Sequence, residues 1–240
     1  MDYISTRGGC SAVDSAQAVL SGLAPDGGLY MPRAFPAFDW KACLKGTSQQ
    51  MSTAILSALL PDIPRMETLV SQAYTGKFET EDLTPTVSVG PFQVLELFRG
   101  PTSAFKDVAL SMLPQLLTAA KAEKGITKEI RILTATSGDT GKAALVGFQD
   151  VPGVNIQVFY PQGGVSQVQR AQMVTQEGKN VSVCAVEGNF DDAQTGVKQI
   201  FTAFQGKELP FLLSSANSIN IGRLAPQIMY YFRCYKDLLD

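Results

Sequence analysis

The chain contains no histidine among its 240 residues, and this absence removes several kinds of chemistry. A Ser-His-Asp or Cys-His triad cannot be built within the chain, and an ordinary zinc site is disfavoured because histidine is one of the usual zinc ligands. Acid–base chemistry near neutral pH therefore falls to lysine, aspartate, glutamate or a cofactor group. No metal site is expected.

Long apolar runs and clusters of basic residues are also lacking. No run of about eighteen apolar residues predicts a membrane span, and the first residues do not have the pattern of a signal peptide. The net charge is −2, with no basic stripe of the kind that binds nucleic acid. We therefore expect a cytoplasmic protein with neither a membrane nor a nucleic-acid partner.

Cysteine is scarce and widely spaced, at positions 10, 43, 184 and 234, with no Cys-x-x-Cys pair. This spacing predicts isolated, buried thiols in a reducing compartment. With 45% hydrophobic and 18% charged residues, the chain can form a real core. Its length predicts one or two domains.

The pattern along the chain changes near residue 90. Residues 1–90 are predicted to form a mainly helical domain, with helices at 15–23, 48–60 and 66–74. Residues 91–240 alternate short apolar strands with helix-length segments, which predicts an α/β domain with a parallel sheet and helices on both faces. The expected strands are 94–97, 130–134, 156–160, 181–186 and 211–213, and the expected helices are 106–121, 140–148, 166–177, 191–204 and 221–238.

The most informative segment surrounds Lys106, which follows a Gly-Pro turn and stands between Phe105 and Asp107. A lysine in apolar surroundings is a candidate nucleophile, because desolvation favours a neutral amine. Such an amine can form a Schiff base with pyridoxal phosphate. The alternative is a solvated lysine in the first turn of a helix, and the neighbouring segments favour the first interpretation. Asp107 is expected to cap or orient the helix rather than to catalyse.

Two further segments each follow a predicted strand and precede a helix. The first contains Ser137, Gly138, Asp139, Thr140 and Gly141, whose glycines and helix-start N–H groups suit an anion such as a substrate carboxylate. An ordinary strand-to-helix turn capped by Asp139 is the alternative.

The second segment concentrates amides, hydroxyls and one arginine in Asn217, Ser218 and Arg223, which suits phosphate or carboxylate recognition. A capped helix start with a solvated Arg223 is the alternative. Gly188-Asn189-Phe190 also resembles a phosphate-binding loop. Asp191 and Asp192 follow it and would repel phosphate, so we interpret the segment as a helix cap.

Taken in order, these segments resemble threonine synthase, of the subgroup with an extra N-terminal domain. The matching motifs are Ser5-Thr6-Arg7-Gly8, residues 22–30, residues 96–107, residues 134–141 and residues 215–220. The resemblance implies the fold of the tryptophan-synthase-β type of pyridoxal-phosphate enzymes. It also implies conversion of O-phospho-L-homoserine and water to L-threonine and phosphate.

The resemblance also implies roles for the candidate residues. Lys106 would hold the cofactor and then move protons, and residues 137–141 would bind cofactor and the substrate carboxylate. Asn217, Ser218 and Arg223 would bind either the substrate phosphate or the cofactor. The chain departs from the family at Arg99, Ser103 and Gly164, where the family commonly has histidine, leucine and a basic residue.

The resemblance covers only the first half of such an enzyme, so we expect a fragment with little activity, weak cofactor binding and a tendency to self-associate. Two alternatives stay open. One is a related β-eliminating enzyme, such as a serine or threonine dehydratase, against which the N-terminal motifs argue. The other is a non-catalytic folded module that binds a partner.

Overall fold

The computed structural model describes residues 1–204 and 206–239, so residue 240 at the end of the second predicted domain lies outside the described part. Its centre is a four-stranded parallel sheet in the order β7-β6-β5-β8. The strands are β5 (Glu129–Ala135), β6 (Val154–Pro161), β7 (Val181–Val186) and β8 (Phe211–Ser214). The predicted α/β fold with a parallel sheet is confirmed, and the strand bounds differ from the predicted ones by at most two residues at either end.

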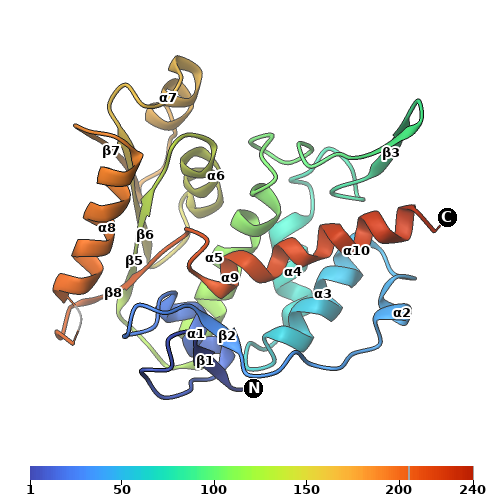
Figure 1. Ribbon diagram of the computed structural model, residues 1–240, viewed down its shortest axis with the longest axis horizontal. Helices are drawn as coiled ribbons and strands as arrows, with labels where there is room; N and C mark the ends of the chain where they lie inside the picture. The colour runs from blue at the N-terminus through green and yellow to red at the C-terminus, as the bar shows by residue number, and fades with distance from the viewer. Residues whose placement is uncertain (205, 240) are drawn as a thin grey trace.

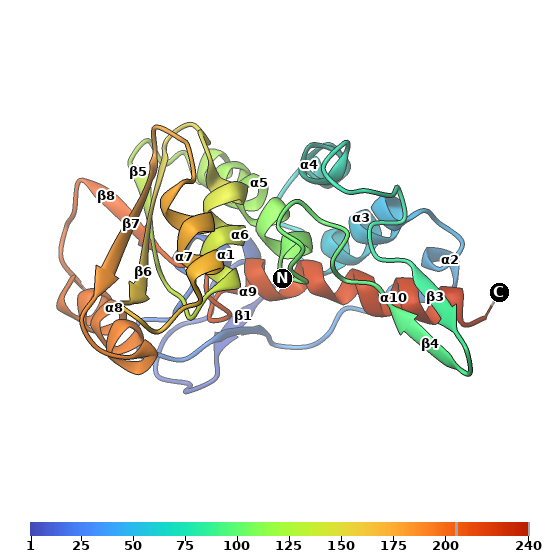
Figure 2. The same cartoon turned by 90° about the horizontal axis from the view of Figure 1, so that it is seen from above.

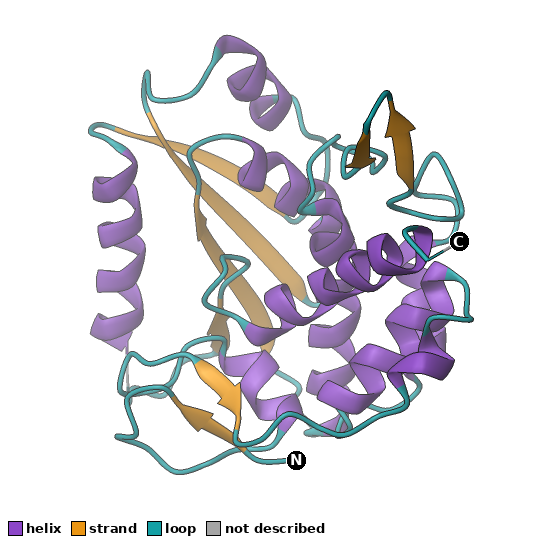
Figure 3. Cartoon of the chain, turned by 45° about the vertical axis from the view of Figure 1, so that its right-hand side comes forward, coloured by secondary structure: helices purple, strands orange, loops and turns teal. Residues whose placement is uncertain are grey.

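Helices cover both faces of this sheet (Figure 3). On one face lies α8 (Phe190–Phe204), whose Ala193 and Val197 form a small apolar cluster with Ala135 of β5. The other face packs against α5 (Asp107–Glu123) and α6 (Asp139–Phe148), with α7 (Gln167–Val174) beside α6. Ile132 points to this side, since neighbouring strand residues alternate between faces.

The first ninety residues are mainly helical, as predicted. The helices are α1 (Ser15–Ser21), α2 (Trp40–Cys43), α3 (Ser48–Leu59) and α4 (Met66–Tyr74). Asp14 caps α1 by accepting from the Gln17 N–H at 2.8 Å, and Thr47 and Gln50 form a capping box at α3. The short strands β1 (Tyr3–Ser5) and β2 (Tyr30–Pro32), which pair antiparallel, were not predicted.

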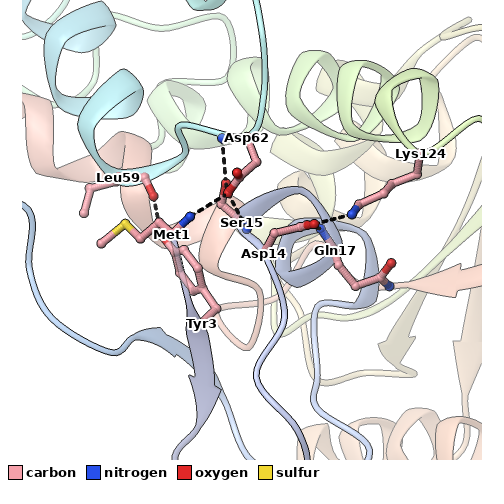
Figure 4. A network of polar contacts seen from close by, with 8 residues as sticks. All are labelled: Met1, Tyr3, Asp14, Ser15, Gln17, Leu59, Asp62 and Lys124. Atoms are coloured by element: carbon pink, nitrogen blue, oxygen red, sulfur yellow. Dashed lines mark hydrogen bonds and ion pairs between the residues drawn. The ribbon is translucent and has the colours of Figure 1, made fainter.

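Polar contacts tie this region together and to the sheet domain (Figure 4). Asp62 accepts from the N–H and the hydroxyl of Ser15 at 3.1 and 2.8 Å, and from the N-terminal amine at 3.2 Å. Asp14 pairs with Lys124, which directly follows α5. The main apolar core is continuous from Tyr3 to Tyr230, so the two predicted domains share one core. Their boundary at residue 90 stays a prediction.

The strand predicted at 94–97 exists but does not join the parallel sheet. It is β4 (Phe92–Leu95), which pairs antiparallel with β3 (Thr86–Val89) in a hairpin. The reason is the intervening Gly90, whose φ of 59° closes a tight turn, so that β4 finds its partner locally. Figure 2 shows the hairpin projecting beside α10 (Ile228–Asp237), apart from the sheet.

The single helix predicted over 221–238 is also wrong. The segment consists of α9 (Ile221–Leu224), a 3-10 turn (Ala225–Gln227) and α10, which runs toward the C-terminus across the front of Figure 1. Pro226 explains the break, because it lacks the N–H that an α-helix needs at this point.

The cysteines are free, as expected, but only Cys43 is buried, whereas Cys184 is exposed and Cys10 and Cys234 are partly exposed. Cys184 lies on the outermost strand β7, where a strand residue can face solvent. In the described part of the chain, no helix has the length and apolar character to cross a bilayer.

Candidate functional site

Lys106 is the last residue before α5, at the end of a loop that we call the lysine loop (residues 100–106). Its side chain is 16% exposed, and the amine lies 4.3 Å from the centre of the Phe105 ring. The loop is built from two tight turns, in which the Ser103 N–H donates to the Gly100 carbonyl and the Asp107 N–H donates to the Ala104 carbonyl. The lysine is therefore held at a defined helix entry rather than on a mobile surface.

The Lys106 amine reaches a residue that is 33 positions away in sequence. Its Nζ lies 2.7 Å from Oδ2 of Asp139, the first residue of α6. Asp139 is 52% exposed, so the pair lies at the surface of the described structure. This contact joins the two sequence segments that we singled out separately.

Asp107, the first residue of α5, holds the lysine loop through its buried carboxylate. Its carboxylate accepts from the Thr102 hydroxyl at 2.6 Å, the Thr102 N–H at 2.8 Å and the Ala104 N–H at 3.4 Å. The residue is only 2% exposed, and burial raises the pKa of its carboxyl. A Cβ on Gly100 would lie 2.5 Å from the Asp107 Cβ, so only glycine fits beside it. The expectation that Asp107 has a structural role agrees with these contacts.

Residues 136–141, which we call the glycine turn, connect β5 to α6 at the carboxyl end of the sheet. The buried Thr136 hydroxyl oxygen accepts from the Gly138 and Gly141 N–H groups at 3.0 and 2.9 Å. The Thr140 N–H is bonded to the Asp139 side chain. In the described structure only the Ser137 and Asp139 N–H groups of this turn lack a partner, so its capacity for an anion is smaller than a fully open turn would offer.

The segment 215–223 lies beside the glycine turn because β8 is the parallel neighbour of β5. Asn217 donates to the carbonyl of Ala135 at 3.0 Å, at the end of β5. Ser218 is exposed. Asn220 caps α9 through the Gly222 N–H at 2.8 Å and also donates to the Val19 carbonyl at 2.9 Å, which fastens the segment to α1.

Arg223 is buried rather than solvated, with 3% exposure. Its guanidinium is bonded to Gln227, while its Nε has no partner among the described residues. Burial lowers the pKa of Arg223 to about 10, although the charges of Tyr230 and Asp139 oppose this change. An almost fully buried cation with an unpartnered donor suits an anionic ligand.

The structure thus brings together Lys106, the glycine turn and Asn217, with Arg223 close enough for the charge of Asp139 to oppose the lowering of the Arg223 pKa. Sequence reasoning had assigned no role to Thr136 and Asn220, although both stand in the quoted motifs. Threonine two residues before a glycine, and asparagine before a helix, are capping patterns that could have identified them.

The Gly188–Phe190 segment is a helix cap, as interpreted. The Asn189 N–H donates to the Asp192 carboxylate at 2.8 Å, and the Asp192 N–H donates to the Asn189 side chain at 3.1 Å. No group of three or more potential metal ligands occurs in the part of the chain that is described.

Fold and site define a class of protein: an α/β chain in which a lysine at the start of α5 faces a glycine-rich turn at the carboxyl end of a parallel sheet. The particular match is to threonine synthase. Residues 2–74 match the family model "Threonine synthase N terminus". The resemblance stated from the motifs is therefore confirmed.

Whole-chain comparisons agree. The chain is 38% identical to threonine synthase of Methylobacillus glycogenes over 98% of its own length and 52% of that relative. It is 39% identical to threonine synthase of Pseudomonas aeruginosa, covering 97% of this chain and 50% of the relative. Its structure superposes on pyridoxal-phosphate-bound threonine synthase from Brucella melitensis with a TM-score of 0.85 at 38% identity, covering 99% of this chain and 52% of that one. The chain thus spans about half the length of the curated relatives it matches.

Proposed function

We propose that this chain supplies the cofactor lysine and part of the substrate site of a threonine synthase, a pyridoxal-phosphate-dependent carbon-oxygen lyase. The overall reaction would convert O-phospho-L-homoserine and water to L-threonine and phosphate. The observation that supports this proposal most directly is the 2.7 Å contact between the Lys106 amine and Asp139 at the glycine turn, since it joins two family motifs in one site.

The residues present fit the cofactor in part. Lys106 offers an amine near the surface of the described structure, and Arg223 offers a buried, unpartnered donor. Ser137, Gly138, Asp139, Thr140 and Gly141 would border the cofactor ring, with Asp139 leaving its contact with Lys106. When bound, pyridoxal phosphate supplies an electron sink for the carbanion that forms on the substrate.

The chain's own residues would then act on the substrate. The Ser137 and Asp139 N–H groups at the start of α6 would bind the substrate carboxylate, where the helix dipole favours negative charge. The Ser137 and Thr140 hydroxyls would add further donors. Asn217, Ser218 and Arg223 would hold the substrate phosphate, and the Lys106 amine would move protons at the α and β carbons.

A hybrid protein tests this proposal. The chain is joined to the part of the Methylobacillus glycogenes relative that it does not cover, and the product is assayed with O-phospho-L-homoserine. We expect equal amounts of threonine and phosphate. The variant Lys106→Ala should lose this activity and also the lysine label trapped by borohydride, whereas Lys198→Ala on the exposed face of α8 should keep both. Labelling of a different lysine in Lys106→Ala would refute the assignment.

The same hybrid discriminates a dehydratase. That enzyme would release 2-oxobutanoate from threonine and no phosphate from O-phospho-L-homoserine. The match of residues 2–74 to the threonine synthase N terminus favours the first function. A cytoplasmic location and self-association of the isolated chain belong to the same proposal.

A further inference from the structure

Among the described contacts, Lys106 makes no hydrogen bond of its own to the rest of the lysine loop; its amine lies over the Phe105 ring of that loop and reaches Asp139. Its backbone carbonyl accepts from Leu110 in α5 at 2.8 Å, which fixes only the helix side of the residue. The orientation of the side chain therefore depends on how the preceding loop is held.

The buried attachment of that loop is the Asp107 carboxylate. It receives three donors from Thr102 and Ala104, all of them on the loop. The outer end of the loop is held by Arg99, which pairs with Glu96 at 2.6 Å and Glu79 at 2.8 Å, but these groups are more exposed and weaker restraints.

The contacts that hold the lysine loop also carry two unfavourable contributions to the free energy of folding. A carboxylate with 2% exposure and no cation bonded to it is disfavoured by burial, and the charge of Asp139 disfavours it further. The non-glycine residue Ser103 takes a φ of 56°, which L-residues rarely adopt. Both unfavourable features lie within three residues of Lys106.

We propose that Asp107 is the positioning residue for Lys106, because its carboxylate fastens the lysine loop to the first turn of α5 and so aims the amine at the glycine turn. This inference concerns geometry within the chain. It deepens the proposed function but is tested without the cofactor, so each can fail separately.

The experiment measures trace acetylation of Lys106 by acetic anhydride, quantified by peptide mass spectrometry against the exposed Lys198 of the same molecule. Releasing the loop frees the amine from Asp139, so Asp107→Asn should raise relative labelling about two- to fivefold, the range expected for loss of one partly exposed ion pair. Thr102→Val removes the 2.6 Å hydroxyl bond without changing any charge, and it should also raise labelling, by a smaller factor. Thr102→Val therefore tests whether Lys106 labelling depends on the bonds that hold the loop or on the charge of Asp107.

Two controls make the result decisive. Asp26→Asn removes a carboxylate that likewise fastens a loop through three bonds, to Ser5, Gly9 and Gly28, and it should leave Lys106 labelling unchanged. In an Asp139→Asn background, where the amine is already free, Asp107→Asn should add nothing. Unchanged labelling in folded Asp107→Asn and Thr102→Val, or an equal increase in the Asp139→Asn background, would overturn the proposal.

Discussion

Two threonines on one stretch of chain show how differently a buried hydroxyl can act. Thr136 accepts from two N–H groups of the glycine turn, whereas the hydroxyl of Thr134, buried two residues earlier, has no partner among the described residues. Thr136→Val should leave the buried Gly138 N–H unpaired, whereas the Gly141 N–H keeps its bond to the Gly138 carbonyl, and it should lower the free energy of unfolding by about 1–3 kcal/mol. Thr134→Val should change it by less than about 0.5 kcal/mol or raise it.

Urea unfolding of both variants measures this difference. Because the two substitutions are chemically identical, a similar loss of stability in both would mean that the Thr136 hydroxyl does not organise the turn.

The contribution of Asp62 to the stability of the fold depends on pH. Burial raises the pKa of its carboxyl, but the Ser15 donors and the N-terminal amine outweigh burial, so the net shift is downward. A lowered pKa stabilises the fold above the unfolded value of 3.8, and this contribution is lost as pH falls through the folded pKa. Asp62→Asn should therefore cost about 0.5–1 kcal/mol at pH 7 and almost nothing at pH 3. Urea titrations at the two pH values decide this, and an equal cost at both would contradict it.

At the level of elements, two helical glycines differ in their surroundings. A Cβ on Gly147 in α6 would lie 2.1 Å from the Leu110 carbonyl oxygen of α5, whereas a Cβ on Gly196 in α8 would meet nothing within 4 Å. Gly147→Ala should force the helices apart and cost about 1–3 kcal/mol. Gly196→Ala should stabilise by about 0.5–1 kcal/mol, because glycine loses more entropy in a helix.

Thermal unfolding of the two alanine variants compares these effects directly. A destabilised Gly196→Ala protein would show that α8 is not held as the structure places it.

The elements that the sequence predicted well are those with a strong local signal. The strands β5 to β8 and the helices between them follow from apolar runs and helix-start residues. The hairpin partner of β4 was missed because β3 is only 4 residues long, too short for its alternating pattern to stand out, and Pro226 was overlooked inside an otherwise helical pattern. The burial of Arg223 could not be foreseen, because α9 packs against α5 and α1, which are far from it in sequence.

The candidate site was predictable as a set of segments, since each motif follows a strand. Its assembly was not, because the sequence does not state that β8 lies next to β5. The contact of Lys106 with Asp139 is likewise a tertiary contact, between residues 33 positions apart in sequence.

For the whole molecule, exposed apolar side chains predict self-association. Tyr231, Tyr235, Leu238 and Leu239 on and after α10, together with Phe92 of the hairpin, are exposed. Apolar patches of this kind commonly mark interaction surfaces. Sedimentation should show self-association that increases with protein concentration. The association constant should be lower by at least about threefold in a Tyr231→Ser, Leu239→Ser double variant. A monomer at all concentrations would contradict this.

The isolated chain should also bind pyridoxal phosphate weakly. The cofactor phosphate carries about two negative charges and needs several fixed donors, while the glycine turn retains only two unpartnered N–H groups in the described structure. Spectroscopic titration should give a dissociation constant well above micromolar and no phosphate release from O-phospho-L-homoserine. Tight, stoichiometric binding with turnover would refute this expectation.

The neighbourhood of β5 and β8 has a consequence for biosynthesis. Asn217 and Ser215 bond to carbonyls of β5 that were made 82 residues earlier. A ribosome adding about 5–20 residues per second needs about 4–16 s to proceed from residue 135 to residue 214. During that interval one side of β5 is a row of unpaired N–H and C=O groups, open to any other nascent strand. This edge of β5 therefore stays open until β8 has been made, and we expect it to need protection from other nascent strands during that interval.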